Sequence, residues 1–159
     1  MHMLIIAMTN TQESQCHCTT LRKASRRISR LYDMALASSG LKVTQVALLG
    51  QIRRSGPVPV GELAEALVMD SGALAHTLKP LERDGLVSLS VDPKDRRSRL
   101  VALTPQGMAK LDETDPLWAK AHRGFEAAIG ATTAGPLREA LRRLVSEDFS
   151  AAFEKALAD

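Results

Sequence analysis

Aromatic residues are scarce in this 159-residue chain, at 3% of the total, and there are two cysteines. With few aromatics and many Ala and Leu, the composition favours helix over strand. Two cysteines separated by one residue cannot link distant parts of a fold by a disulfide, which favours a reducing, cytoplasmic location. No run of about 18 apolar residues occurs, so we expect no membrane span. The sequence therefore predicts a mainly α-helical protein that folds without disulfides.

Common catalytic and nucleotide-binding motifs are missing as well. The sequence contains no G-x-S-x-G, no G-x-x-x-x-G-K-[ST], no H-E-x-x-H and no G-x-G-x-x-G. A thiol enzyme would have to pair Cys18 with His76 or His122. We therefore expect neither an enzyme nor a bound cofactor or metal ion, and a thiol enzyme is the rival hypothesis.

Positive charge is unevenly distributed along the chain. Residues 1–104 contain 14 Lys and Arg against 9 Asp and Glu, whereas residues 105–159 contain 7 against 9. The first part therefore carries a net charge of +5 and the second a net charge of −2. We expect the basic part to be the one that meets a polyanion.

Apolar periodicity predicts a series of short helices in the first half of the chain. One helix spans about 19–38 and stops near Gly40, and a second, which we expect Thr44 to cap, follows as "QVALLGQIRR". The two prolines of "PVPV" permit only an edge strand. Two further helices, "GELAEAL" and "SGALAHTLKPLERDG", are separated by the break "VMD", and Gly85 ends the second.

The last two of these helices have the spacing of a helix-turn-helix, and a basic hairpin follows them. The second helix has an apolar stripe at Leu74, Leu78 and Leu81 and a small, polar opposite face. "LVSLSV" and "RLVALT" predict two strands joined by the loop "DPKDRRS". A basic hairpin in this position is a wing that can enter a minor groove, and a solvated hairpin is the alternative.

The wing combines Asp95 and Arg97 with a closing LT-x-x-G pattern that ends at Gly107. With the helices before it, this stretch, residues 63–107, resembles the winged-helix core of MarR-family transcriptional regulators. The resemblance implies a sequence-specific DNA-binding regulator, expected to be a repressor, that binds a near-palindromic operator as a homodimer. Dimer symmetry then mirrors the symmetry of the operator.

The same resemblance implies how the chain is divided. A single MarR-like domain would span residues 16–159, preceded by a loose N-terminal arm at residues 1–15. Within this domain, residues 41–104 would form a winged helix-turn-helix core, flanked by dimerisation helices in residues 16–40 and 105–159. The implied fold class is mainly α with a small β-wing.

The C-terminal part of the sequence supports a dimer independently. A helix begins at Thr104 and Pro105 and runs past Trp118, and Pro116 should kink or break it near its middle. Pro136 is expected to open a last helix with two neighbouring apolar stripes. Two stripes are more than one small domain needs, so we expect part of this surface to be buried in a homodimer.

We expect the exposed face of the recognition helix and the tip of the wing to contact double-stranded DNA. Small residues at the helix start permit close approach to the major groove, whereas His76 and Lys79 can reach base edges or phosphates. Pro80 should bend the last turns of this helix. Asp95 is expected to orient an arginine of the wing. The predicted DNA-binding residues are Ser71, Gly72, Ala73, Ala75, His76, Thr77, Lys79, Lys94, Arg96, Arg97 and Arg99.

Cys16, His17 and Cys18 stand at the start of the first helix, and the candidate sensor residues are Cys16, Cys18 and Tyr32. Adjacent side chains cannot easily converge on one metal ion, whereas a thiol in a first helical turn is activated by the helix dipole. The stretch resembles the one-cysteine organic-hydroperoxide sensors of the MarR family, in which a reactive Cys precedes a Tyr by fourteen residues. Cys18 precedes Tyr32 by this distance, and Val43 stands where those sensors have a second Tyr.

Three alternatives stay open at the level of the sequence. The signal that releases the protein from DNA is either oxidation of Cys16 and Cys18 or a small aromatic or amphipathic effector in the cleft beside the first helix. The basic run "LRKASRRISR" is either a solvated face or an anion site. A winged-helix interaction module without specific DNA binding is the alternative function.

Overall fold

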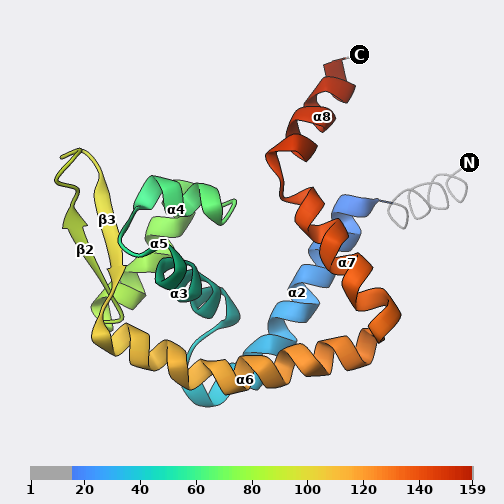
Figure 1. Cartoon of the computed structure of the whole chain (residues 1–159), viewed down its shortest axis with the longest axis horizontal. Coiled ribbons are helices and arrows are strands. Elements are labelled where there is room, and N and C mark those ends of the chain that lie inside the picture. The colour runs from blue at the N-terminus through green and yellow to red at the C-terminus, as the bar shows by residue number, and fades with distance from the viewer. Residues whose placement is uncertain (1–15, 159) are drawn as a thin grey trace, which may run out of the picture.

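The computed structural model describes residues 16–158 and is mainly helical, with one small antiparallel sheet among the described elements (Figure 1). None of the helices in this part of the chain has an apolar stretch long enough to cross a membrane. The elements are α2 (His17–Leu36), the 3-10 helix η1 (Ala37–Ser39), α3 (Val43–Ser55), β1 (Val58–Pro59), α4 (Val60–Ala66), α5 (Ser71–Arg83), β2 (Val87–Val91), β3 (Arg99–Leu103), α6 (Pro105–Ile129), α7 (Ala131–Leu144) and α8 (Glu147–Ala158).

The predicted helix-turn-helix is present as α4 and α5. Four residues, 67–70, join the two helices, and the Asp70 carboxylate caps α5 by accepting from the backbone N–H groups of Gly72 and Ala73 at 2.9 and 3.1 Å. Gly85 follows α5 at φ 72°, where a left-handed residue is needed to turn the chain into β2. The helix-turn-helix prediction is therefore confirmed.

The predicted wing is also present, as the hairpin of β2 and β3. These strands pair antiparallel from Val87–Leu103 to Val91–Arg99, and β1 pairs with the other edge of β3. The sheet order is β1-β3-β2, so β1 is an edge strand, as the missing N–H of Pro59 requires.

The LT-x-x-G pattern is explained by the junction between the wing and α6. Thr104 caps α6 by accepting from the Gly107 N–H at 2.9 Å, and its hydroxyl donates to the Gly85 carbonyl at 2.6 Å. A Cβ on Gly107 would lie 1.9 Å from the Leu86 carbonyl oxygen, so only glycine fits here. The threonine and the glycine together fix the start of α6 against the end of α5.

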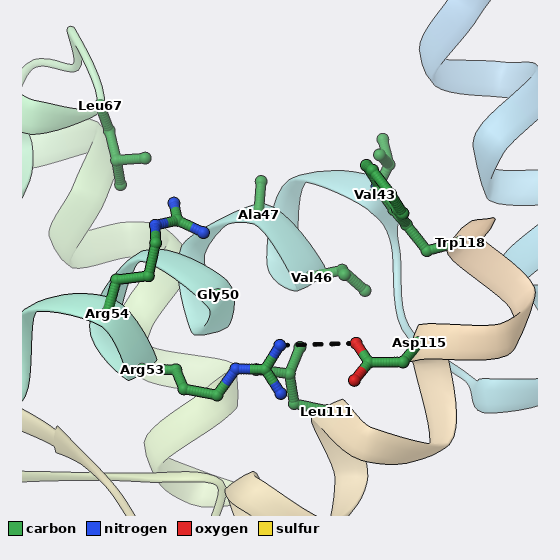
Figure 2. A pocket seen from close by; sticks show the side chains of 10 residues that line it. All are labelled: Val43, Val46, Ala47, Gly50, Arg53, Arg54, Leu67, Leu111, Asp115 and Trp118. Atoms are coloured by element: carbon green, nitrogen blue, oxygen red, sulfur yellow. Dashed lines mark hydrogen bonds and ion pairs between the residues drawn. The ribbon is translucent and has the colours of Figure 1, made fainter. Parts of the chain in front are cut away.

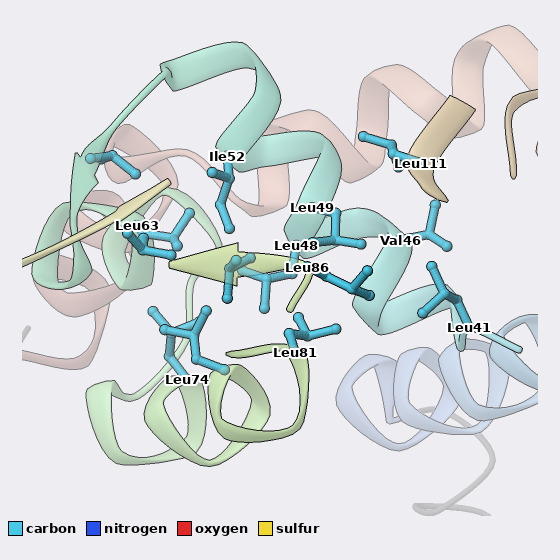
Figure 3. Packing of buried hydrophobic residues seen from close by; sticks show 14 of the residues in the cluster. Leu41, Val46, Leu48, Leu49, Ile52, Leu63, Leu74, Leu81, Leu86 and Leu111 are labelled. Atoms are coloured by element: carbon cyan, nitrogen blue, oxygen red, sulfur yellow. The ribbon is translucent and has the colours of Figure 1, made fainter. Parts of the chain in front are cut away.

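One tight core joins α3, α4, α5 and the sheet to the first turns of α6 (Figure 3). Leu49, Leu63, Leu74 and Leu81 are fully buried in it. The three leucines predicted for the inner face of α5 all lie in this core. Nearly all of the buried apolar residues belong to residues 41–111, so this part of the chain completes its own core.

Two predictions of helix starts are wrong. Thr44 does not cap α3, because the helix begins one residue earlier, at Val43. The N–H of Val43 donates to the Asp33 carboxylate at 2.7 Å and that of Lys42 to the Gln45 side chain at 2.9 Å. The Asp33 carboxylate, which lies on α2 ten residues earlier, thus caps α3 in place of the expected Thr44 hydroxyl.

The expectation for Pro136 is wrong for a different reason. The last helix does not open there, since α7 begins at Ala131 after Gly130, whose φ is 88°, and Pro136 lies inside it. The single predicted helix is instead two, because the chain turns at Val145 and Ser146. The Ser146 hydroxyl then accepts from the Phe149 N–H at 3.3 Å at the start of α8.

The prolines inside α5 and α6 do not break their helices. Pro80 lies within α5 and Pro116 within α6, and both helices continue beyond them. Each proline removes one backbone N–H, and Pro116 is exposed, so water can reach the carbonyl that loses its partner. Of the kink or break expected at Pro116, the break is therefore wrong, and the kink stays a prediction.

Candidate nucleic-acid interface

The recognition helix α5 presents its predicted DNA-binding residues to solvent. Its leucines face the core, and nearly all of the predicted side chains are exposed on the opposite face. Thr77 is half-buried, and its hydroxyl donates to the Ala73 carbonyl at 3.0 Å. The helix itself therefore takes the proton of the Thr77 hydroxyl, which leaves its methyl group and the lone pairs of its oxygen available to a base.

The tip of the wing is shaped by two aspartates. Asp92 is buried, with 8% of its surface exposed, and its carboxylate accepts from the Lys94 N–H at 2.8 Å. The Asp95 carboxylate accepts from the Arg97 N–H at 3.0 Å. The contact of Asp95 is with the backbone of Arg97, and its expected role of orienting an arginine side chain of the wing stays a prediction.

Both ends of the wing loop are held by its backbone. The Asp92 N–H donates to the Ser98 carbonyl at 3.0 Å, and the Ser98 N–H donates to the Asp95 carbonyl at 2.9 Å. The loop is thus closed on itself, while Lys94, Arg96 and Arg97 project from it as exposed side chains. None of them lies within 4.0 Å of a carboxylate belonging to residues 16–158.

A cavity of about 430 Å³ lies between α5 and the wing. Lys79 from α5 and Arg97 and Arg99 from the wing line it, together with Glu82. Three cations facing one groove create the positive potential that attracts a phosphate backbone. The structure therefore brings Lys79 of the recognition helix and Arg97 and Arg99 of the wing to one groove.

A second cavity, of about 420 Å³, lies between α3 and α6 and was not foreseen from the sequence (Figure 2). Its walls are mainly apolar, with Val43, Leu111 and Trp118 among them, and Arg53 and Arg54 extend over it. Arg53 pairs with Asp112 at 3.1 Å and Asp115 at 3.5 Å. These pairs connect the helix-turn-helix side of the molecule to α6.

The guanidinium of Arg54 has different partners from that of Arg53. Its guanidinium donates to the Gln51 side chain at 2.6 Å and has no carboxylate within 4.0 Å among residues 16–158. An amphipathic anion could thus place its charge beside Arg54 and its apolar part beside Trp118. The sequence signal that could have located this cavity is the Arg53–Arg54 pair at the end of an apolar helix.

The candidate sensor residues lie on α2 but do not meet within one chain. Cys16 is the N-cap residue of α2 and Cys18 is exposed in its first turn. Tyr32 is fourteen residues further along the same helix, which is about 21 Å at 1.5 Å per residue. A contact between the Cys18 thiol and the Tyr32 hydroxyl therefore cannot form inside a single copy of the chain.

The local electrostatics differ between the Cys16 thiol and the Tyr32 phenol. The side chain and the backbone of Thr19 favour the thiolate of Cys16 and lower the pKa of its thiol. Burial, followed by the nearby Glu126 carboxylate, raises the pKa of the Tyr32 phenol. Cys16 is thus the more readily ionised group, and Tyr32 stays protonated at physiological pH.

An apolar groove of about 470 Å³ runs beside Tyr32 between α2 and α6. Ile28, Leu31 and Tyr32 form one wall, and Gly124 and Phe125 belong to the other. The groove corresponds to the cleft beside the first helix that the sequence indicates. It has no charged residue in its lining, unlike the cavity at Arg53 and Arg54.

The chain is similar to known regulators over most of its length. The model of the MarR family matches residues 41–98. The HTH-type transcriptional repressor NicR of Pseudomonas putida is 31% identical over 134 residues, which cover 82% of this chain and 83% of NicR. The transcriptional activatory protein BadR of Rhodopseudomonas palustris is 35% identical over 97 residues, which cover 53% of this chain and 55% of BadR. The crystal structure of the M. tuberculosis transcriptional regulator MOSR in complex with DNA has a TM-score of 0.75 at 31% identity, with 82% of this chain and 94% of MOSR covered.

Proposed function

Since this chain belongs to the MarR family of transcriptional regulators, we propose that it is a homodimeric repressor that a small amphipathic anion releases from its operator. The fold is a winged helix-turn-helix, and the protein acts as a DNA-binding regulator. The observation that best supports the proposed contacts is the joint positive surface of α5 and the wing. MOSR, a structural relative, is described in complex with DNA, whereas NicR and BadR are named a repressor and an activator.

In the proposed complex, α5 lies in the major groove and the wing in the adjacent minor groove. The small residues Ser71, Gly72 and Ala73 permit the helix start to approach the bases, and His76 and Lys79 reach base edges or phosphates. Lys94, Arg96, Arg97 and Arg99 contact phosphates or the minor groove. Asp92 and Asp95 hold the wing loop in the shape that presents these cations.

A homodimer is supported by the apolar surface outside the winged-helix core. Leu31, Leu141, Leu144 and Phe153 are each more than a third exposed. Exposed large apolar side chains on three helices outside the core support an association surface in this part of the chain. We assign dimerisation to residues 16–40 and 105–159, on either side of the DNA-binding part, and we place the protein in the cytoplasm, where its operator lies.

The proposed effector site is the cavity at Arg53 and Arg54. An aromatic carboxylate matches its apolar wall at Trp118 and its cation at Arg54. Its charge would also compete with Asp112 and Asp115 for Arg53, and this pair connects α3 to α6. Weakening that connection alters the position of the winged-helix core relative to the dimer, which offers a route from ligand to DNA affinity.

The experiment measures binding of the dimer to DNA from upstream of its own gene by fluorescence anisotropy, with benzoate and hydroxybenzoates as probes. Specific binding that falls when a probe is added supports the proposal. Trp118 is the one tryptophan of the chain, so its emission reports whether a probe enters the cavity. Arg54→Gln should abolish the response to the probe, and Arg143→Gln, on exposed α7, is the matched control.

Two other outcomes would change the proposal. Indifference to every carboxylate, with loss of DNA binding after stoichiometric organic hydroperoxide, favours sensing by Cys16 and Cys18. A partner's Tyr32 would then have to supply any phenol beside Cys18, since the same chain cannot. Dimerisation without salt-dependent binding to DNA would favour a winged-helix interaction module. Turnover of a substrate would favour the alternative hypothesis of a thiol enzyme.

A further inference from the structure

The turn between α4 and α5 holds one residue in a backbone conformation that its side chain disfavours. Val68 has φ 52°, and among residues 16–158 it is the one residue other than glycine with a positive φ. The left-handed region brings the Cβ close to the following carbonyl oxygen, and a branched Cβ increases the crowding. The helix-turn-helix therefore contains a local strain at Val68.

The hydrogen bonds of this turn show that it needs a left-handed residue. The Val68 N–H donates to the Glu65 carbonyl at 3.0 Å, and the Met69 N–H donates to the Ala64 carbonyl at 2.9 Å. These two bonds form a Schellman motif, in which the residue at the position of Val68 is usually glycine. Glycine would make the same turn without the steric cost. The turn thus requires the conformation but not the valine side chain.

Packing within the chain does not offset the strain at Val68. Its neighbours Leu67 and Met69 pack against the core, whereas 72% of the Val68 surface is exposed. This is the largest exposed fraction among the large apolar residues in 41–111. A side chain that is strained, apolar and exposed is expected at a functional position, where a second molecule covers it.

Val68 lies close to the part of α5 that is proposed to enter the major groove. It precedes Ser71, the first residue of α5, by three positions, so the two Cα atoms are at most about 11 Å apart. The major groove is about 12 Å wide, so a helix start inside it brings this turn to its edge. The turn and the tip of the wing both lie away from α6 (Figure 1). Between Arg54 and Lys79 the sequence contains no Lys or Arg, so a contact by this turn is not a cation–phosphate pair.

We propose that Val68 is a specificity-determining residue, whose isopropyl group contacts a thymine methyl at the edge of the major groove. This inference rests on the proposed docking of α5 and adds to it a residue that precedes the recognition helix. The C5-methyl of thymine is the apolar group that distinguishes this base in the major groove, so an apolar side chain there selects it. Contact removes both apolar groups from water, which offsets the strain of the turn in the complex.

Substitutions of Val68 should change stability and DNA affinity in opposite directions. Val68→Gly relieves the turn, so the midpoint of urea unfolding should rise. Its binding to DNA from upstream of its own gene should weaken about tenfold, because the dimer loses two copies of the contact. Val68→Ala keeps a Cβ but loses both methyl groups, so it should lose similar affinity with a smaller gain in stability.

Two controls separate an apolar contact from other causes. No charge changes in these variants, so the slope of log affinity against log salt should stay that of the wild type. Gly135→Ala, inside α7, also stabilises a helix and should leave DNA affinity unchanged.

DNA prepared with deoxyuridine in place of thymidine gives the decisive measurement, because it lacks every thymine methyl. The wild type should lose affinity on this DNA, and Val68→Gly should lose about tenfold less, since its share of the loss is already present. Equal losses in the two proteins would refute the thymine contact. Wild-type DNA affinity in Val68→Gly would refute it as well, whether or not dimerisation changes. A wild-type chain without specific DNA binding would instead refute the proposed function, and this contact with it.

Discussion

The winged-helix core and the helices on either side of it have similar apolar content. They differ in how much of it is buried. In residues 41–111 the leucines of α3, α4 and α5 are buried against one another. In α2 and in the chain beyond Trp118, large apolar side chains remain at the surface, as Leu31 at 50% and Leu157 at 73% exposed illustrate. The first region completes its core alone, whereas the second requires another surface.

This difference indicates how the two tasks of a regulator are divided. The part that reads DNA needs a rigid base for a few exposed cations, and the core supplies it. The flank needs apolar surface for association, and it can leave that surface exposed only until a partner covers it. Substitutions in the two regions should therefore differ in which measurement they affect.

Glycines show the largest expected contrast. Gly107→Ala would place a methyl group 1.9 Å from the Leu86 carbonyl oxygen, so we expect destabilisation of more than about 4 kcal/mol or failure to fold. Gly135→Ala, inside α7, meets no atom within 4 Å and should stabilise by up to about 1 kcal/mol through helix propensity. Urea unfolding followed by circular dichroism measures both. Equal effects would show that the junction at Leu86 is not a tight one.

Leucine truncations give the next contrast. Leu81→Ala removes a fully buried side chain, so the free energy of unfolding should fall by about 3 kcal/mol at any protein concentration. Leu157→Ala removes an exposed one and should cost less than about 0.5 kcal/mol in the monomer. Its effect should appear instead as weaker dimerisation, measured by sedimentation equilibrium. A large loss of monomer stability in Leu157→Ala would contradict the division into two regions.

Arginine substitutions separate DNA binding from stability. Arg97→Ala, at the wing, should weaken operator binding about tenfold and reduce the slope of log affinity against log salt by about 1, since one phosphate contact is lost. Arg143→Ala, on α7, changes the net charge equally and should leave both quantities close to those of the wild type. Anisotropy titrations at several salt concentrations check this. A similar loss in both variants would indicate general electrostatic attraction only.

The smallest effect concerns the reactivity of Cys16. Thr19→Val removes the hydroxyl that lowers the pKa of the Cys16 thiol, so this pKa should rise toward its ordinary value. In a chain with Cys18→Ser, alkylation by iodoacetamide should then slow near pH 7, because the thiolate is the form that reacts. The difference should vanish well above the ordinary thiol pKa, because both chains are then ionised. Unequal rates that persist at high pH would point to access as the cause.

Local sequence signals determined the recognition helix and the wing. The leucine stripe of α5, its cap at Asp70 and its stop at Gly85 depend on neighbouring residues, so periodicity and capping rules found them. The basic tip of the wing followed from the composition of its loop. The residues of the LT-x-x-G pattern were visible in the same way, although the reason for Gly107, a close approach to the Leu86 carbonyl, was not.

Tertiary structure alone decided the features that join distant residues. Asp33 starts α3 from ten residues away, and Arg53 reaches Asp112 across 59 positions to form one side of the cavity. The burial of Asp92 and its hydrogen bond to the Lys94 N–H, which shape the wing loop, are visible only in the structure. The sequence by itself determined the helix-turn-helix, the caps at Asp70 and Thr104 and the basic composition of the wing, because these depend on residues within a turn or two. Cavities, ion pairs between helices and the outward course of α8 depend on how the helices pack, which no local pattern specifies.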